Sequence, residues 1–111
     1  MIFHYSSHVD ISVICDPDKL TDRGCCGAPD LIFEIVSPSS RKLDYGIKNV
    51  IYAQSGVREY WIVDPKRKTI SVNYFEGNIV SVQYPFDSII KVNIYEDLFI
   101  NFSEIANMLN I

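Results

Sequence analysis

The sequence predicts an α+β (α/β) fold in which a mixed β-sheet is flanked by helices. Three observations predict it. Short runs of β-branched and aromatic residues recur along the chain, one longer segment has its apolar residues at helical spacing, and a shorter helical segment ends the chain. The chain has 111 residues, of which 48% are hydrophobic. This is enough for one core, so residues 1–111 are expected to form a single domain.

The first part of the chain carries two strand signals separated by a loop. Residues 9–15 are β-branched and largely alternating, which predicts a strand. Residues 16–29 are rich in Asp, Gly and Pro without a period, so a loop is expected there. Residues 31–36 predict the second strand, and the serines of residues 37–40 offer hydroxyl groups that can cap a helix.

A helix is predicted over residues 41–54, where a Ser-Gly pair closes a segment with helical periodicity. Gly46 lies inside it and costs about 1 kcal/mol relative to alanine, so a packing reason or a later helix start is expected. Asp44, Lys48 and Tyr52 stand four residues apart and form one stripe along the helix. The apolar residues that recur at helical spacing are Leu43, Ile47, Val50 and Ile51.

Strand and turn signals alternate through the rest of the chain. A short helix over residues 104–109 follows them, with Ser103 as its expected cap. The expected order of elements is therefore β, β, α, β, β, β, β, α. The four predicted strands in this part are residues 57–63, 69–75, 79–84 and 89–94.

Two carboxylates in the second predicted strand are the most informative feature of the sequence. Asp30 and Glu34 stand in an otherwise apolar run, and side-chain alternation places both on one face. An ionised carboxylate in a buried strand must be paired, protonated or bound to a cation. Natural proteins tolerate such placements mainly at sites that use the charge.

Asp10, Glu34 and Lys48 can meet without strained geometry, because they come from the first strand, the second strand and the helix that packs over the sheet. Paired carboxylates hold a hard divalent cation, and a nearby ammonium group can orient a water molecule or stabilise developing charge. The same three residues fit a structural ion pair equally well. Both interpretations stay open on spacing alone.

Composition limits the classes of function. The formal net charge of −4 argues against a domain that coats nucleic acid by bulk electrostatics. Arg41 and Lys42 nevertheless follow the acidic strand, and the basic run at residues 66–68 is interpreted as a solvated hairpin turn. No apolar run reaches the roughly 18 to 20 residues of a membrane helix, and the N-terminus lacks signal-peptide features. A cytoplasmic location without a membrane partner is expected.

Four motifs occur together in this chain: residues 10–16 (DISVICD), residues 27–39 (GAPDLIFEIVSPS), the spaced Asp44, Lys48 and Tyr52, and residues 56–65 (GVREYWIVDP). Together they resemble the Uma-two-type family of putative restriction endonucleases, which has the fold of the PD-(D/E)XK nuclease superfamily. The resemblance runs from Asp10 almost to the C-terminus and implies a single PD-(D/E)XK nuclease-like domain.

The resemblance implies a metal-dependent DNA endonuclease. Asp10 is then the aspartate of the PD element and Glu34 the acidic residue of the (D/E)XK element, and both ligate Mg²⁺ (or Mn²⁺). The third position of that element is Val36 in place of lysine, and Lys48 in the helix is expected to replace it. The implied catalytic residues are Asp10, Glu34 and Lys48.

Five further positions match the family signature, and two of them, Tyr60 and Asp64, are interpreted as core and turn residues. Asp30 and Asp44 are possible supporting residues, although a strand-start role for Asp30 and an ion pair with Lys48 for Asp44 are the simpler interpretations. Trp61 lies in an alternating strand, where a large aromatic side chain is expected to fill the core between sheet and helix and not to stack on a base.

The start of the chain departs from the family pattern. Members usually carry some tens of residues before the PD element, whereas Asp10 has nine residues before it and Val9 stands at the proline position. An N-terminally truncated chain is therefore expected, and an exposed edge on the strand at residues 9–15 predicts a homodimer. The alternative is that residues 1–8 fold back over this edge. The alternative function is a catalytically inactive nuclease-fold remnant that acts as a binding or oligomerisation module.

Overall fold

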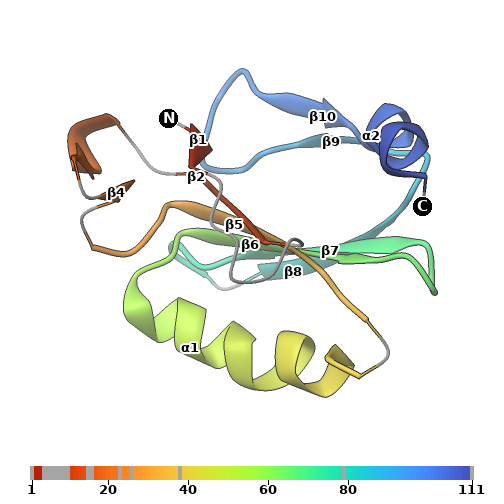
Figure 1. The fold of residues 1–111 in the computed structure, drawn as a ribbon, viewed down its shortest axis with the longest axis horizontal. Helices are drawn as coiled ribbons and strands as arrows, with labels where there is room; N and C mark the ends of the chain where they lie inside the picture. The colour runs from red at the N-terminus through yellow and green to blue at the C-terminus, as the bar shows by residue number, and fades with distance from the viewer. Residues whose placement is uncertain are drawn as a thin grey trace.

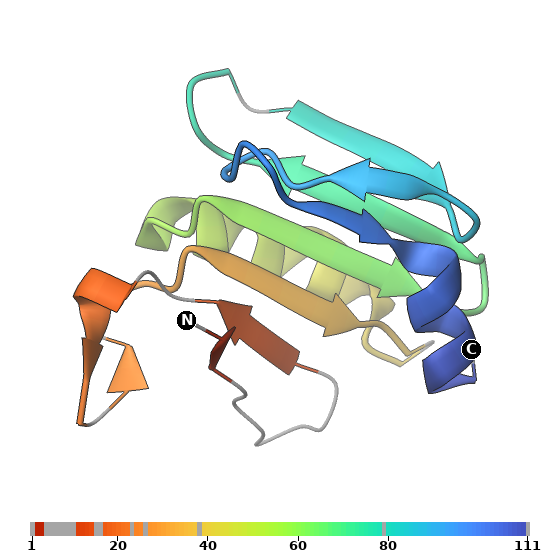
Figure 2. The same cartoon turned by 90° about the horizontal axis from the view of Figure 1, so that it is seen from above.

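A mixed β-sheet lies at the centre of the structure and confirms the predicted α+β class. The structure is a computed structural model that describes residues 2–3, 11–14, 17–22, 24–25, 27–37, 39–78 and 80–110. Within these residues the sheet has six strands in the order β1-β2-β5-β6-β7-β8 (Figure 2). β5 and β6 are parallel, and the other neighbouring strands are antiparallel. The strands are β1 (Ile2–Phe3), β2 (Ile11–Ile14), β5 (Leu31–Ile35), β6 (Glu59–Asp64), β7 (Thr69–Tyr74) and β8 (Val80–Pro85).

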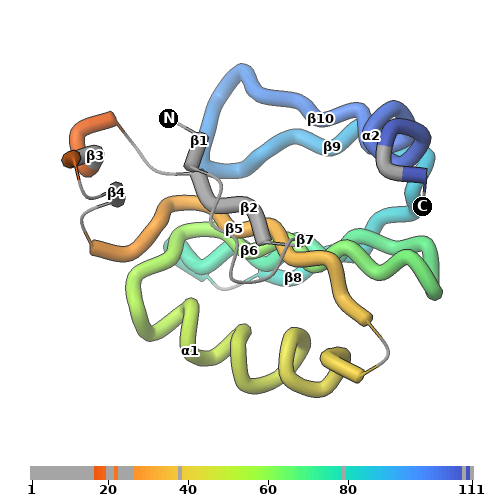
Figure 3. Tube along the Cα trace, in the orientation of Figure 1, coloured from red at the N-terminus to blue at the C-terminus, as the bar shows by residue number. Residues whose placement is uncertain are grey.

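The two faces of the sheet are covered by different elements (Figure 1). One face carries the helical connection between β5 and β6, which consists of the π-helical segment η2 (Leu43–Ile47) and α1 (Lys48–Ser55). The opposite face carries a two-stranded sheet of β9 (Ile89–Lys91) and β10 (Phe99–Asn101), followed by α2 (Phe102–Leu109). The backbone trace shows this separation clearly (Figure 3). The connection between the parallel strands therefore lies on the face towards which Glu34 points.

Each face of the sheet has its own group of buried apolar residues. On the α2 side the group is centred on Trp61, which is fully buried as predicted, contacts Phe33 edge-to-face and donates its indole N–H to Glu59 at 2.6 Å. The other residues of this group are Leu31, Val63, Ile70, Val72, Ile90, Val92, Phe102 and Ala106. On the α1 side the buried residues are Ile32, Val36, Val57, Tyr60 and Ile62, with Tyr45 and Tyr52 packed against them.

The helix at residues 41–55 confirms the prediction in position, but its apolar stripe faces outwards. Leu43, Ile47, Val50 and Ile51 are 43%, 61%, 56% and 49% exposed. The stripe of Asp44, Lys48 and Tyr52 faces the sheet instead, because Glu34 on β5 forms an ion pair with Lys48 there. A buried carboxylate on the sheet thus decides which side of the helix turns inwards.

Gly56 ends the helix in the left-handed region with φ 93°, and its N–H donates to the Tyr52 carbonyl, as predicted for a C-terminal glycine. At Gly46, an added Cβ would meet no atom of the described residues within 4 Å. The expected packing reason for Gly46 is therefore absent from the part of the chain that the structure describes.

Several predicted boundaries are wrong for identifiable reasons. The loop expected at residues 16–29 contains the short 3₁₀ helix η1 (Pro17–Lys19) and a small hairpin of β3 (Leu20–Thr21) and β4 (Gly24–Cys25). β9 ends at Lys91 and not at residue 94, because the backbone N–H groups of Asn93 and Ile94 donate to buried Glu59. The chain then reverses its direction and forms β10, a strand that the sequence pattern does not predict.

Ser103 is not the cap of the last helix. Asn101 occupies the N-cap position, and the Ser103 hydroxyl donates to the Asn101 side chain at 2.8 Å. Similarly, the Ser40 hydroxyl donates to the Asp44 carboxylate at 2.7 Å in place of capping the first helix. In both places a serine hydroxyl binds a nearby side-chain oxygen and does not accept from a backbone N–H of the first turn.

β1 pairs with the outer edge of β2, with Ile2 opposite Ile14 and Phe3 opposite Val13. For residues 2–3 this pairing agrees with the alternative that residues 1–8 fold back over the edge, and the rest of that segment lies outside the described residues. No helix within the described ranges has the length and apolarity needed to cross a membrane.

Candidate active site

Glu34 is a buried carboxylate with a defined partner on each oxygen. It is the fourth residue of β5 and only 2% exposed. Its Oε1 lies 2.6 Å from the Lys48 ammonium, and its Oε2 accepts the Tyr60 hydroxyl at 2.9 Å. Each carboxylate oxygen can accept about two hydrogen bonds. The Glu34 carboxylate therefore keeps acceptor capacity while it is held in a fixed orientation.

Lys48 is the first residue of α1 and joins two carboxylates. Its ammonium lies 2.6 Å from Glu34 and 3.0 Å from the Asp44 Oδ1 atom one turn earlier. Burial lowers the pKa of Lys48, but hydrogen bonds to Glu34 and Asp44 and their negative charges outweigh burial and raise the pKa above its usual value. Lys48 is therefore a permanent cation at neutral pH and not a proton acceptor.

Asp44 is held as firmly as Glu34. It is 2% exposed, and its Oδ2 accepts the Ser40 hydroxyl at 2.7 Å. Its backbone carbonyl lies 3.1 Å from the Tyr60 hydroxyl, which also contacts Glu34. Tyr60 thus ties the helix to the sheet at the point where the two carboxylates approach each other.

Two tyrosines in this site have raised pKa values. Burial raises the pKa of Tyr60, and the Glu34 charge raises it further. Burial and the charge of Glu34 likewise raise the pKa of Tyr52 to about 12. The rings of Tyr52 and Tyr60 are in edge-to-face contact, with centroids 4.9 Å apart. Both phenols therefore stay protonated at neutral pH and act as hydrogen-bond donors.

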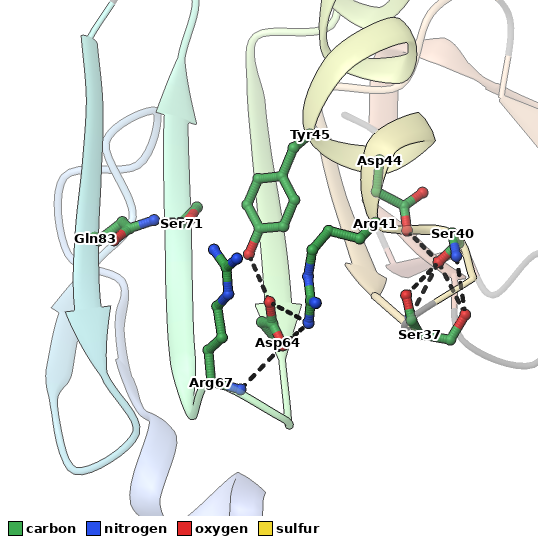
Figure 4. A network of polar contacts seen from close by, with 9 residues as sticks. All are labelled: Ser37, Ser40, Arg41, Asp44, Tyr45, Asp64, Arg67, Ser71 and Gln83. Atoms are coloured by element: carbon green, nitrogen blue, oxygen red, sulfur yellow. Dashed lines mark hydrogen bonds and ion pairs between the residues drawn. The ribbon is translucent and has the colours of Figure 1, made fainter.

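A second polar network fixes the start of the helix to the end of β6 (Figure 4). Asp64 is fully buried and accepts from Arg41 at 3.1 and 3.2 Å, from the Tyr45 hydroxyl at 3.1 Å and from the Arg67 N–H at 3.1 Å. Burial raises the pKa of Asp64, but the Arg67 N–H, Arg41 and Tyr45 together outweigh burial and lower it. Because Asp44 and Lys48 follow Arg41 in the same helical stretch, this network places them over Glu34.

The structure brings together three of the five site residues expected from the sequence. Glu34, Lys48 and Asp44 share one cluster. Asp30 lies directly before β5 and four residues before Glu34, on the order of 13 Å away. Its carboxylate forms ion pairs with Lys19 at 2.9 Å and Arg58 at 3.7 Å. Asp10 lies outside the described residues.

The side chains of the cluster suit a hard divalent cation in their chemistry. The Glu34 and Asp44 oxygens both lie within ion-pair distance of one ammonium, so they are close together. The three side chains carry a net charge of −1, and carboxylate oxygens are the preferred ligands of Mg²⁺. Among the described residues, no group of three His, Cys, Asp or Glu side chains could hold a metal ion. Glu34 and Asp44 are therefore the carboxylates that this cluster offers to a cation.

Tyr60 and Asp64 match the family signature but are expected from the sequence to be core and turn residues, whereas the structure gives each of them polar contacts in this region. Alternation along β6 puts Tyr60 and Ile62 on the face of the sheet that α1 covers, and this signal could have placed Tyr60 beside Glu34. The contact between Arg41 and Asp64 spans 23 residues of sequence. No local pattern marks it.

Comparison with known proteins gives the family. A family model named Uma2 and described as a putative restriction endonuclease matches residues 8–103. The chain belongs to the Uma2 family. This confirms the resemblance seen in the four motifs.

Among solved structures, this Uma2 chain is similar to a putative nuclease belonging to DUF820 from Anabaena variabilis ATCC 29413. The TM-score is 0.61 at 18% sequence identity, and the match covers 83% of this chain and 55% of that chain. The likeness shows a shared fold, and the Uma2 chain spans about half the length of its structural neighbour. The search of curated proteins gave no match.

Proposed function

We propose that this Uma2 chain is a metal-dependent DNA endonuclease-like domain that hydrolyses phosphodiester bonds. The observation that carries the proposal is the contact between buried Glu34 and Lys48 at 2.6 Å. It places an ammonium beside the acidic residue of the motif although Val36 occupies the usual lysine position. The expected cytoplasmic location gives such an enzyme access to DNA.

Asp10 and Glu34 are the proposed ligands of Mg²⁺ or Mn²⁺, with Asp44 in support. The resemblance to the family motifs carries the assignment of Asp10, since Ile11 is the residue that stands opposite Glu34 in the register of β2 and β5. A divalent cation, when bound, polarises the phosphodiester and lowers the pKa of water. Asp10 would add a further carboxylate to the site.

The residues of the chain itself have separate tasks in hydrolysis. Glu34 is held in one orientation by Lys48 and Tyr60. Lys48 is protonated, so it can donate a hydrogen bond that orients the attacking water or stabilises negative charge on the phosphate. Asp44 is bound to the same ammonium and fixes its direction. Asp30 is proposed to have no direct part, because its charge is balanced by Lys19 and Arg58.

Plasmid nicking in Mg²⁺ and calorimetric titration of the metal test the proposal together. We expect weak Mg²⁺ binding and slow nicking by the parent chain, and loss of both in Glu34→Ala and Asp10→Ala. Lys48→Met is expected to lose nicking. Glu104→Ala is the matched control, because Glu104 is an exposed carboxylate on α2, across the sheet from the site.

Two outcomes would contradict the proposal. If the Glu34 and Asp10 variants nick DNA as fast as the parent, the assignment of these residues is wrong. If the parent binds no divalent cation and nicks no DNA, the alternative of an inactive nuclease-fold module replaces the enzyme.

A further inference from the structure

Basic residues lie on two segments, distant in the sequence, that Asp64 joins at one end of the sheet. Lys42 lies at the start of the helical connection, and Lys66, Arg67 and Lys68 form the turn between β6 and β7. All four side chains are exposed. We call these four residues the basic end. The turn itself confirms the hairpin expected at residues 66–68.

Asp64 is the residue that holds the two segments together. Its carboxylate accepts from the Arg41 guanidinium on one side and from the Arg67 backbone N–H on the other (Figure 4). The negative charge of Asp64 is fully buried and balanced by Arg41. The ion pair between Asp64 and Arg41 therefore does not neutralise the positive charges of Lys42 and the turn.

The basic end lies beside the candidate active site. β5 and β6 are parallel, and Ile62 is paired with Glu34. Asp64 is two residues further along β6, so its backbone is about 8 Å from that of Glu34. The turn residues begin two positions beyond Asp64, so at about 3.4 Å per nucleotide along a duplex the basic end lies a few nucleotides from the Glu34 site.

The charge of the basic end contrasts with that of the whole chain. The formal net charge of the chain is −4, yet the basic end carries four positive charges. Exposed Asp87 lies in a neighbouring turn, two residues after Pro85, the residue that pairs with Thr69. One carboxylate leaves a local excess of positive charge, as a phosphate backbone requires.

We infer that the basic end binds phosphates of the DNA strand a few nucleotides from the bond that the Glu34 site cleaves. The inference rests on the proposed function for its location and on the charge for its ligand. Lysine and arginine contacts to phosphates position a duplex without reading its sequence. The basic end therefore contributes affinity and orientation and no base preference.

Binding of a fluorescein-labelled 30-base-pair duplex of mixed sequence, measured by polarisation in EDTA, tests the inference without cleavage. The first variant is Lys66→Gln/Arg67→Gln/Lys68→Asn, in which asparagine suits the left-handed φ of 52° at residue 68. The second is Lys42→Gln, on the other segment. Lys91→Gln is the matched control, because Lys91 is an exposed lysine on β9.

We expect the triple variant to bind the duplex at least about tenfold more weakly than the parent does. The slope of log K against log salt should become shallower by about one for each phosphate that the variant no longer binds. Lys42→Gln should weaken binding in the same direction, and Lys91→Gln should bind like the parent. Thermal melts followed by circular dichroism check that each variant is folded. If folded variants bind like the parent, or if the parent binds no duplex, the inference is overturned.

The outcomes separate this inference from the proposed function. If the parent nicks plasmid and the triple variant binds and nicks equally well, the inference about the basic end is wrong and the proposed function stands. A parent that binds duplex through these residues but nicks nothing contradicts hydrolysis and supports the basic end.

Discussion

At the scale of single residues, the site depends on one ammonium shared by two buried carboxylates. Lys48 lies 2.6 Å from Glu34 and 3.0 Å from Asp44, and both acids are 2% exposed. Without Lys48, two negative charges would remain close together and out of water. A buried charge that loses its partner is far more costly than a buried pair that is removed as a whole.

Lys48→Met is therefore expected to lower the free energy of unfolding by about 3–5 kcal/mol. The lysine side chain is 25% exposed, so the lower end of this range is expected. The double variant Glu34→Gln/Lys48→Met should recover part of the loss. Urea denaturation at neutral pH measures both variants, and Lys42→Met is the control on an exposed lysine of the same helical stretch. A double variant less stable than the sum of its single variants would contradict this account.

Asp64 gives a pH prediction of definite sign. Its pKa in the folded chain is lowered from 3.8, so its contribution to stability is complete above that value and is lost as pH falls through the folded pKa. Asp64→Asn should thus be less stable than the parent at pH 6, and the difference should shrink at pH 3. Urea midpoints at both pH values measure this, and a difference that grows towards acid would contradict it.

At the scale of elements, sequence patterns predict the position of the helical connection but not which of its sides faces the sheet. The spacing of Asp44, Lys48 and Tyr52 placed these three side chains on one face, and strand alternation placed Glu34 where that face could meet it. Which stripe of the helix faces the sheet was decided by the ion pair, which no local pattern contains. The exposed Ile47 shows the result.

Local patterns also failed where a distant side chain competes for backbone groups. Glu59 accepts the N–H groups of Asn93 and Ile94, so β9 ends before the apolar run that predicted it. The Asp64 network escaped prediction for the same reason, because Arg41 is 23 residues away in the sequence. Strand positions followed from alternation, and contacts between elements did not.

The two glycines of the helical connection give opposite predictions. Gly46→Ala is expected to stabilise the chain by about 0.5–1 kcal/mol, because the new Cβ meets nothing within 4 Å of the described residues and alanine loses less backbone entropy. Gly56→Ala is the matched comparison and should destabilise by about 1–2 kcal/mol, because its φ of 93° is left-handed. Thermal melts of both variants measure this, and equal effects would contradict it.

At the scale of the whole molecule, association remains a prediction. The homodimer was expected from an open edge on the strand at residues 9–15, but β1 is paired with β2 at Val13 and Ile14. A dimer that uses this edge must therefore extend beyond these two pairs or displace β1. The two catalytic sites of a dimer would suit cleavage of both DNA strands.

Sedimentation velocity across micromolar concentrations measures association directly. A homodimer is expected to approach twice the 12.7 kDa of one chain as concentration rises. A species that stays at 12.7 kDa over the same range would contradict the dimer and agree with a self-covered edge.

The charges of Glu34, Asp44 and Lys48 also allow a prediction about how related chains are selected. Folding alone does not need them, since apolar side chains of similar volume can replace a buried ionic group without loss of stability. A lineage selected only for a stable module is therefore expected to lose all three charges together, because the loss of one alone is penalised. Selection for cleavage predicts the opposite, that related chains retain all three charges. Inactive relatives should accordingly be distinguishable by coordinated replacement at these three positions.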